Sequence, residues 1–369
     1  MTSMQRLVEI LTNKGALLPD WAAPVASADR GLFIPDIFEG VDKAADPDRW
    51  LRMVYGDLPI ITQVNDGQDL GEDAFRLPTS SSSMPSLMLE MLGLLDVRDG
   101  HKVLEVGAGT GLNIRWIAQR VGADNATSIE IDPGIAETAR RNLEASGLSP
   151  TVLTGDGMIG CPSRAPFDRL ICTYTVREVP YSWVEQTPGG RIVAPWGSSF
   201  YSHSFVTLDV ADGAAQGRFT GTPAFMWDRT HRAGSGRISD YYRGEVGTKS
   251  RTKINPRNVR WHDDAEFAIS LTVTDAWCTL READDGSDEA TYWILADDRK
   301  SWATVEYVPG REDYEVDQYG PRNLWDEVEA AWHHWDAAGR PGRDRFGLTV
   351  DGDGQRVWLD ETGNTWSLA

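Results

Sequence analysis

Three glycines at alternate positions, Gly107, Gly109 and Gly111, end a short apolar run of strand type. Glycine is required where a backbone turns sharply or lies against a ligand with no room for a Cβ atom. A helical pattern over 112–121 follows, and the free N–H groups of its first turn would face whatever occupies the glycine turn. This spacing indicates a site for a nucleotide-like cofactor. The dinucleotide fingerprint needs its third glycine one position later, where Leu112 stands, so a nicotinamide site is disfavoured.

Two acidic residues stand at the ends of the next predicted strands. Glu130, followed by Ile131, lies about 20 residues past the glycines, where a carboxylate can hold ribose hydroxyls. A strand over 151–154 leads into Asp156 and Gly157. The alternative is that the glycines form an ordinary tight turn that binds no ligand. Because glycines or acids stand at the ends of all three predicted strands, the sequence favours a cofactor site.

Strand and helix patterns alternate along the middle of the chain after the glycine strand. Such alternation predicts a Rossmann-like α/β fold with a mostly parallel, doubly wound sheet. Predicted helices cover 5–14, 85–95, 112–121, 134–146 and 178–187, and predicted strands cover 126–131, 151–154, 167–173 and 190–196.

The remaining sequence differs in pattern on both sides of this region. Residues 19–75 are irregular in period and rich in Pro, Gly and Asp. The later part is β-rich, with strands predicted over 267–273 and 291–295 and a hairpin around 351–354. A helix is predicted over 323–339, because its apolar residues recur at spacings of three and four. We therefore divide the chain into an N-terminal cap over 1–78, a Rossmann-like core over 79–200 and a β-rich C-terminal extension over 201–369.

The composition argues against several kinds of partner. The 369 residues include 56 Asp+Glu against 36 Lys+Arg, a formal net charge of −20, whereas nucleic-acid binding needs a basic face. The start of the chain has no long apolar stretch, and no window resembles a membrane span. The three cysteines form no C-x-x-C pair, so neither a zinc site nor a disulfide framework is expected. We expect a cytoplasmic protein without a metal, a membrane partner or a nucleic-acid partner.

One segment departs from the acidic balance. Residues 229–260 contain nine Lys and Arg against two acids, Asp240 and Glu245. The functional interpretation is a docking surface for an Asp/Glu-rich peptide. The alternative is a solvated loop balanced by the acidic stretch 282–298, and the sequence favours this alternative.

Several segments resemble, in the same order, those of protein-L-isoaspartate O-methyltransferases. The glycine spacing is similar to the first motif of S-adenosylmethionine (SAM)-dependent methyltransferases. The segment 30–35 resembles the R-x-x-F-V-P segment of the family, and 79–85 resembles its T-I-S-Q-P segment, which aligns Ser83 with the functional serine. The resemblance covers roughly residues 5–200 and includes 155–157, 165–168 and 189–195.

This resemblance implies SAM as the cofactor and S-adenosylhomocysteine as the product. It places Ser83, with Ser82 beside it, at the acceptor carboxylate as the catalytic hydroxyl donors. Without the flanking matches, the serine run would be a flexible polar loop with one serine capping the 85–95 helix. The cofactor-binding residues that the resemblance implies are Ser80, Ser81, Ser82, Ser83, Glu105, Gly107, Gly109, Gly111, Glu130, Ile131, Asp156 and Gly157.

Two departures from the family pattern indicate a particular subgroup of the family. The family has a threonine and an isoleucine before its serine, where this chain has Ser80–Ser82. The chain also continues as a long Trp-rich tail, whereas repair enzymes of the family usually stop near the end of the sheet. A serine-rich version with such a tail resembles the homologues that accompany ribosomally synthesised, modified peptides (RiPPs) such as lanthipeptides and graspetides. That resemblance implies methylation of a normal Asp, whose ester closes to an aspartimide and hydrolyses to isoaspartate.

The predicted function is SAM-dependent O-methylation of an Asp side chain in a modified precursor peptide. The alternative within the class is repair of isoaspartyl residues in damaged proteins, and the alternative outside it is a peptide-binding accessory protein without activity. Intact Gly107, Gly109, Glu130 and Asp156 disfavour the accessory protein. A carboxylate is already ionised at pH 7 and needs little or no general base, so orientation and proximity would supply most of the acceleration. The sequence leaves the oligomeric state open.

Overall fold

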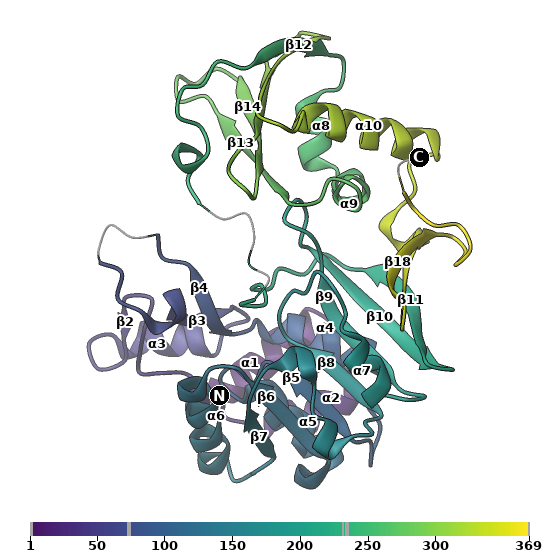
Figure 1. Cartoon of the computed structure of the whole chain (residues 1–369). Coiled ribbons are helices and arrows are strands. Elements are labelled where there is room, and N and C mark those ends of the chain that lie inside the picture. Colours follow the sequence, from purple (N-terminus) through teal and green to yellow (C-terminus); the bar gives the residue numbers. More distant parts are fainter. Residues whose placement is uncertain (1–2, 72–74, 231, 233–235, 368–369) are drawn as a thin grey trace. The chain divides into compact units, whose positions relative to one another are not determined.

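The computed structural model describes residues 3–71, 75–230, 232 and 236–367. The chain divides into two compact units (Figure 1). The first contains Met1–Pro195, Phe205–Gly217 and Val350–Gln355, and the second contains Trp196–Ser204, Arg218–Thr349 and Arg356–Ala369. The chain therefore leaves the first unit and returns to it twice.

The centre of the first unit is a parallel β-sheet, as the alternating patterns predict. Its strands are β5 (Val103–Val106), β6 (Ala126–Glu130), β7 (Thr151–Thr154), β8 (Arg169–Cys172) and β9 (Arg191–Trp196). They lie in the order β9-β8-β5-β6-β7, and each neighbouring pair is parallel (Figure 1). The sheet reaches nine strands with β10 (Ser204–Ala211), β11 (Ala214–Thr220), β17 (Phe346–Asp351) and β18 (Gly354–Leu359), which precede β9 in the order β18-β17-β11-β10. The Rossmann-like prediction is confirmed.

Helix α4 (Pro85–Leu95) precedes these strands, and α5 (Leu112–Val121), α6 (Pro133–Ala145) and α7 (Tyr181–Gln186) connect them, all close to the predicted ranges. Both α4 and α6 begin at a proline, whose fixed φ suits the first helical turn. The Asp132 side chain caps α6 by accepting hydrogen bonds from the amides of Gly134 and Ile135. Almost every side chain of α5 is buried, so this helix packs in the core directly after the glycine turn.

The N-terminal part of the first unit is more regular than its sequence pattern suggests. It contains the helices α1 (Ser3–Asn13), α2 (Pro19–Ala26) and α3 (Pro47–Val54), the 3-10 turn η1 (Arg30–Phe33), and the strands β1 (Ile37–Phe38), β2 (Val41–Asp42), β3 (Ile60–Val64) and β4 (Pro78–Ser82). The two helices within 19–75 have eight residues each, which is too short for a clear helical period. The serine run is a strand rather than a flexible loop, because β4 pairs antiparallel with β3.

The second unit is built on a separate antiparallel sheet of five strands in the order β12-β16-β15-β14-β13. These strands are β12 (Thr248–Thr252), β13 (Ala276–Glu282), β14 (Ala290–Ala296), β15 (Trp302–Tyr307) and β16 (Tyr314–Tyr319). The helices are α8 (Pro256–Trp261), α9 (Asp263–Ser270) and α10 (Leu324–Ala337). Trp325 and Val328 of α10 pack with Tyr292 and Val316 of the sheet in one buried cluster. The predicted strand over 291–295 and helix over 323–339 are confirmed.

The predicted strand over 267–273 is wrong, because this region belongs to helix α9. The side chains from Ala265 to Ser270 are all buried, so the alternation of buried and exposed residues that marks a helix is absent. Such a fully buried run fits a buried helix as well as a buried strand. The helix start is visible in retrospect, since three acids occupy the first turn and the His262 side chain accepts a hydrogen bond from the Ala265 amide. Within the described ranges, no helix combines the length and apolar character that crossing a bilayer requires.

Candidate active site

The glycine turn between β5 and α5 is tightly enclosed. The φ angles are +96° at Gly107, +51° at Gly109 and +88° at Gly111. A Cβ atom on Gly107 would lie 2.5 Å from the Thr173 hydroxyl oxygen and 3.0 Å from the Tyr174 ring. Thr173 itself donates a hydrogen bond to the Gly107 carbonyl at 2.7 Å. Glycine is therefore required at position 107 both by backbone conformation and by the close approach of Thr173.

The Glu130 carboxylate lies against this turn. Its Oε2 accepts a hydrogen bond from the Gly109 amide at 3.0 Å, and its Oε1 accepts one from the Asp132 amide at 3.2 Å. Glu130 is 8% exposed, so the carboxylate is held in a fixed position at the end of β6. The next residue, Ile131, is 41% exposed. The structure thus brings together the glycine turn and the predicted ribose-binding acid.

The third strand end adjoins the same region. The Gly155 amide donates a hydrogen bond to the Glu130 carbonyl at 2.9 Å, and the exposed Asp156 accepts one from the Met158 amide at 2.9 Å. A Cβ atom on Gly157 would clash with Val106 of β5. Gly157 is therefore required by packing between the strand ends, while the Asp156 carboxylate stays accessible.

The serine strand β4 lies beside the glycine turn. The Ser81 carbonyl oxygen is 3.2 Å from the position that a Cβ atom on Gly109 would take. The Ser80 hydroxyl is directed to β3, where it accepts a hydrogen bond from Thr62 at 3.3 Å. Ser82 is 2% exposed, and within the described residues its hydroxyl has no hydrogen-bond partner. Ser83 follows β4 and is partly exposed.

These residues fit the SAM that the fold implies. Buried hydroxyl groups are normally hydrogen-bonded, so the unsatisfied hydroxyl of Ser82, the residue after Ser81 on β4, suits a polar ligand. Glu130 would hold the ribose hydroxyls, and the amides at the start of α5 would face the cofactor because its N-cap Gly111 provides no side-chain cap.

Glu105 has a different environment from the other predicted cofactor residues. It is fully buried on β5, where Oε1 accepts a hydrogen bond from the Asn113 side-chain amide at 2.8 Å and Oε2 accepts one from the Ser128 hydroxyl at 2.5 Å. Burial raises the pKa of the Glu105 carboxyl from its ordinary value of 4.5 to about 8, although the two hydrogen bonds favour the ionised form. Glu105 therefore ties α5 and β6 to β5 beneath the turn.

Glu105→Gln is expected to change how stability depends on pH. Because the folded-state pKa is raised, the unfolded chain ionises first, and the wild type loses stability as pH rises from 4.5 to about 8. Glutamine keeps the hydrogen bond from Asn113 and can donate to Ser128. The advantage of the variant over the wild type should therefore grow by up to about 3–4 kcal/mol from pH 5 to pH 8.

Denaturant unfolding at both pH values measures this difference. Glu144→Gln on the exposed side of α6 is the control, since it removes a carboxyl group from solvent-facing surface. Parallel pH profiles for the wild type and Glu105→Gln would contradict a raised Glu105 pKa.

Sequence reasoning missed several residues that hold the site together. Thr173 and Gln63 carry no motif, and they reach the site only through the fold. Gln63 of β3 donates a hydrogen bond to the Asp132 carboxylate at 3.0 Å and so connects the serine hairpin to the start of α6. Arg30 stands in the segment that resembles the family, which is the one indication of its importance that the sequence contains. The sequence contains no indication that Asp57 is important.

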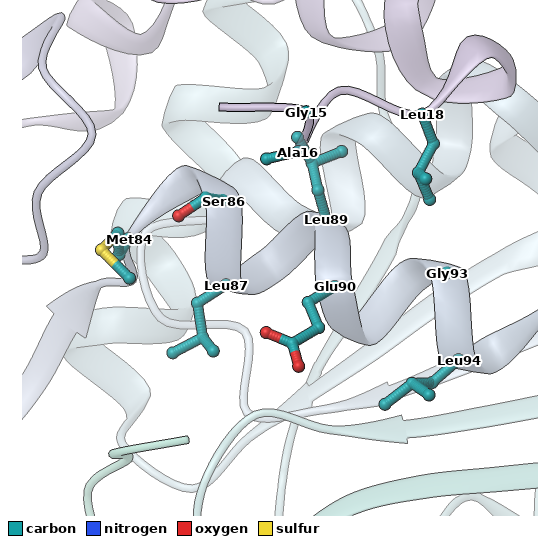
Figure 2. A pocket seen from close by; sticks show the side chains of 10 residues that line it. All are labelled: Gly15, Ala16, Leu18, Met84, Ser86, Leu87, Leu89, Glu90, Gly93 and Leu94. Atoms are coloured by element: carbon teal, nitrogen blue, oxygen red, sulfur yellow. The ribbon is translucent and has the colours of Figure 1, made fainter. Parts of the chain in front are cut away.

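A hollow of about 450 Å³ is lined by helix α4 and by residues 15, 16 and 18 (Figure 2). Leu18, Leu87 and Leu94 line it, and the Glu90 carboxylate points into it between the two leucines of α4 (Figure 2). Partial burial raises the pKa of Glu90. None of the residues predicted for the cofactor site lines this hollow.

The basic stretch 229–260 pairs with acids of its own unit. Lys249 contacts Glu315 at 2.7 Å and Arg251 contacts Asp313 at 2.7 Å. The acidic stretch 282–298 provides partners for Arg257, through Glu282 and Asp288. Residues 231 and 233–235 lie outside the described residues, and the docking surface stays a prediction. In the described ranges, no three His, Cys, Asp or Glu residues form a group suited to a metal ion.

The parallel sheet, the glycine turn and the acid of β6 define a SAM-dependent methyltransferase with a Rossmann-like fold. A family model described as protein-L-isoaspartate(D-aspartate) O-methyltransferase matches residues 2–220. The chain belongs to this protein-L-isoaspartate O-methyltransferase family.

Individual relatives support the same assignment. The chain is 31% identical over 226 residues to a protein-L-isoaspartate O-methyltransferase of Hyperthermus butylicus, which covers 58% of this chain and 83% of that protein. It is 39% identical over 148 residues to the enzyme of the same name from Methanopyrus kandleri, covering 39% of this chain and 66% of that protein. A solved protein-L-isoaspartate O-methyltransferase covers 97% of this chain and 100% of its own with a TM-score of 0.56 at 21% identity, which supports the fold.

Proposed function

We propose that the protein transfers the methyl group of SAM to an aspartyl-type carboxylate in a peptide or protein, with Ser83 and Ser82 orienting the acceptor. The observation that most supports this proposal is the serine strand β4 beside the glycine turn, with the Ser81 carbonyl 3.2 Å from the Cβ position of Gly109. It supports a role for the serine hydroxyls near a cofactor bound at the glycine turn. Hydroxyl groups orient a carboxylate without neutralising it.

The chemistry requires little of the protein beyond orientation. Bound SAM supplies a methyl group on a sulfonium sulfur. A carboxylate oxygen of the acceptor forms the new bond to the methyl carbon, the carbon–sulfur bond breaks, and sulfur keeps the electron pair. No proton is transferred, because the acceptor is already ionised at neutral pH. The chain would hold both reactants in line and exclude water.

We infer that the first acceptor to consider is the isoaspartyl carboxylate, because the family and both relatives are described by it. One feature favours a normal Asp of a modified precursor peptide (RiPP) as the second candidate, namely the serine run Ser80–Ser82 before Ser83. In either case the next backbone nitrogen can attack the ester carbonyl, expel methanol and form an aspartimide.

A methylation assay with matched peptides tests the proposal. The purified protein is given SAM with an isoaspartyl peptide or with its Asp isomer, and methyl incorporation is read by mass spectrometry. Rapid methylation of the isoaspartyl peptide would support repair. If neither peptide is methylated while calorimetry shows SAM binding, the acceptor is a dedicated peptide such as a RiPP precursor. Absence of SAM binding would instead support an accessory protein.

Ser83→Ala is expected to lower kcat roughly 100- to 1,000-fold, the usual effect of removing one preorganised hydrogen-bond donor. SAM affinity should fall less than kcat, because the glycine turn and Glu130 are untouched. Steady-state kinetics and calorimetry measure both quantities. Ser149→Ala is the control, since Ser149 is exposed between α6 and β7. A wild-type kcat for Ser83→Ala would remove Ser83 from the proposed site.

A further inference from the structure

Arg30 is a fully buried cation behind the serine segment. Its Nη1 donates hydrogen bonds to the carbonyls of Val54 at 3.0 Å and Gly56 at 2.9 Å. Its Nη2 donates to the carbonyls of Leu58 at 2.8 Å and Ser83 at 3.3 Å. Burial lowers the pKa of Arg30 to about 10, so the guanidinium is still charged at neutral pH. One side chain thus joins the stretch 54–58 to the backbone of Ser83.

Asp57 makes a second connection from the same stretch. Its Oδ1 accepts a hydrogen bond from the Ser86 amide at 2.8 Å, and its Oδ2 contacts the Lys14 ammonium at 2.7 Å. The Asp57 side chain is 2% exposed. Burial alone would raise its pKa, but the hydrogen bonds from Lys14 and Ser86 hold the pKa below its ordinary value.

The Asp57 contact replaces a cap that helix α4 lacks. Met84, the N-cap residue of α4, makes no side-chain hydrogen bond to the helix. An ionised carboxylate at a helix N-terminus is favoured by the free N–H groups and by the helix dipole. Figure 2 shows Met84 and Ser86 at the start of this helix. The link between β4 and α4 is therefore anchored at Ser83 by Arg30 and at Ser86 by Asp57.

We propose that Arg30 and Asp57 form a clamp that positions Ser83 for the acceptor carboxylate. This inference rests on the proposed methyl transfer. Both residues contact backbone atoms and act through Ser83, so they are positioning residues. Two anchors three residues apart leave the intervening link little freedom to turn the Ser83 hydroxyl away, and a small displacement of a positioning group costs much rate.

Asp57→Ala tests the clamp. It removes the anchor at Ser86 and changes neither the residues of the glycine turn nor Glu130 nor Ser83 itself. We expect kcat to fall about tenfold or more, SAM affinity by calorimetry to be unchanged, and deuterium exchange over 83–86 to be faster. Asp57→Asn should recover most of the activity, because its amide oxygen can accept from the Ser86 amide.

Asp36→Ala is the matched control, since it breaks an exposed ion pair with Lys43 at 2.8 Å in the same part of the unit. A merely structural role would lower activity only in proportion to the protein that still binds SAM, and that result would overturn the clamp. If the wild type binds SAM but methylates no peptide, the proposed function fails separately. Exchange over 83–86 then decides about the clamp, because equal exchange in the wild type and Asp57→Ala would overturn it and faster exchange in the variant would support it.

Discussion

Gly107→Ala should weaken SAM binding by at least about 100-fold, equivalent to ~3 kcal/mol. At φ +96°, a residue with a Cβ atom is strained by about 1–2 kcal/mol. The added Cβ atom would also lie 2.5 Å from the Thr173 hydroxyl oxygen. Relief of that contact requires Thr173 to move and to release the Gly107 carbonyl, which displaces the turn itself. Calorimetric titration with SAM measures the loss.

Gly100→Ala is the control, because it adds backbone strain at a positive φ without a steric clash of the new Cβ atom. Gly100 has a φ of +80°, and a Cβ atom there would meet nothing within 4 Å. It should therefore lower the melting temperature slightly and leave SAM affinity unchanged. If Gly107→Ala bound SAM as tightly as Gly100→Ala does, the close approach at Thr173 would not matter for the cofactor.

Glu130→Ala is expected to weaken SAM binding roughly 10- to 100-fold, since hydrogen bonds to charged groups are worth about 1.5–3 kcal/mol each. The substitution removes the acceptor for the Gly109 amide at 3.0 Å and the carboxylate proposed to hold the ribose hydroxyls. Glu130→Gln keeps one acceptor for the Gly109 amide and should lose less affinity than Glu130→Ala.

Titration calorimetry with SAM and with S-adenosylhomocysteine measures this second effect. Both ligands contain the same ribose, so their affinities should fall together. Glu137→Ala, on the exposed side of α6, controls for the loss of one negative charge near the sheet edge. Unchanged affinity for both ligands in Glu130→Ala would rule out the ribose contact.

The parallel core could be predicted because its information is local. Helix α4 covers the predicted range of 85–95, since Pro85 marks its start and the pattern after it is strongly apolar. Strand β6 could be predicted because it lies between a glycine and an acid. Helix α9 could not be predicted, because burial on all sides removes the periodicity that distinguishes a helix from a strand. The eight-residue helices α2 and α3 have too few turns to show a period.

The same distinction applies to the candidate site. Gly107, Gly109 and Glu130 could be predicted because their roles depend on their place at strand ends. The clamp could not, because Arg30 and Ser83 are far apart in sequence and meet only through a backbone carbonyl. Any residue can supply a carbonyl, so no residue type marks such a contact. The surroundings of Glu105 required the structure as well, since its partners Asn113 and Ser128 come from two different elements.

Residues 350–355 belong to the first unit although they follow nearly the whole of the second. The Gln355 side chain donates a hydrogen bond to the Arg177 carbonyl at 2.9 Å and accepts one from the Val179 amide at 3.2 Å. The first unit is thus completed by residues that follow most of the second unit, so the second unit is not simply appended after the first. A truncated chain ending at residue 220, the limit of the family match, would lose these contacts and strands β17 and β18. A minimal version should instead join residue 220, the end of β11, to residue 346, the start of β17, through a short linker.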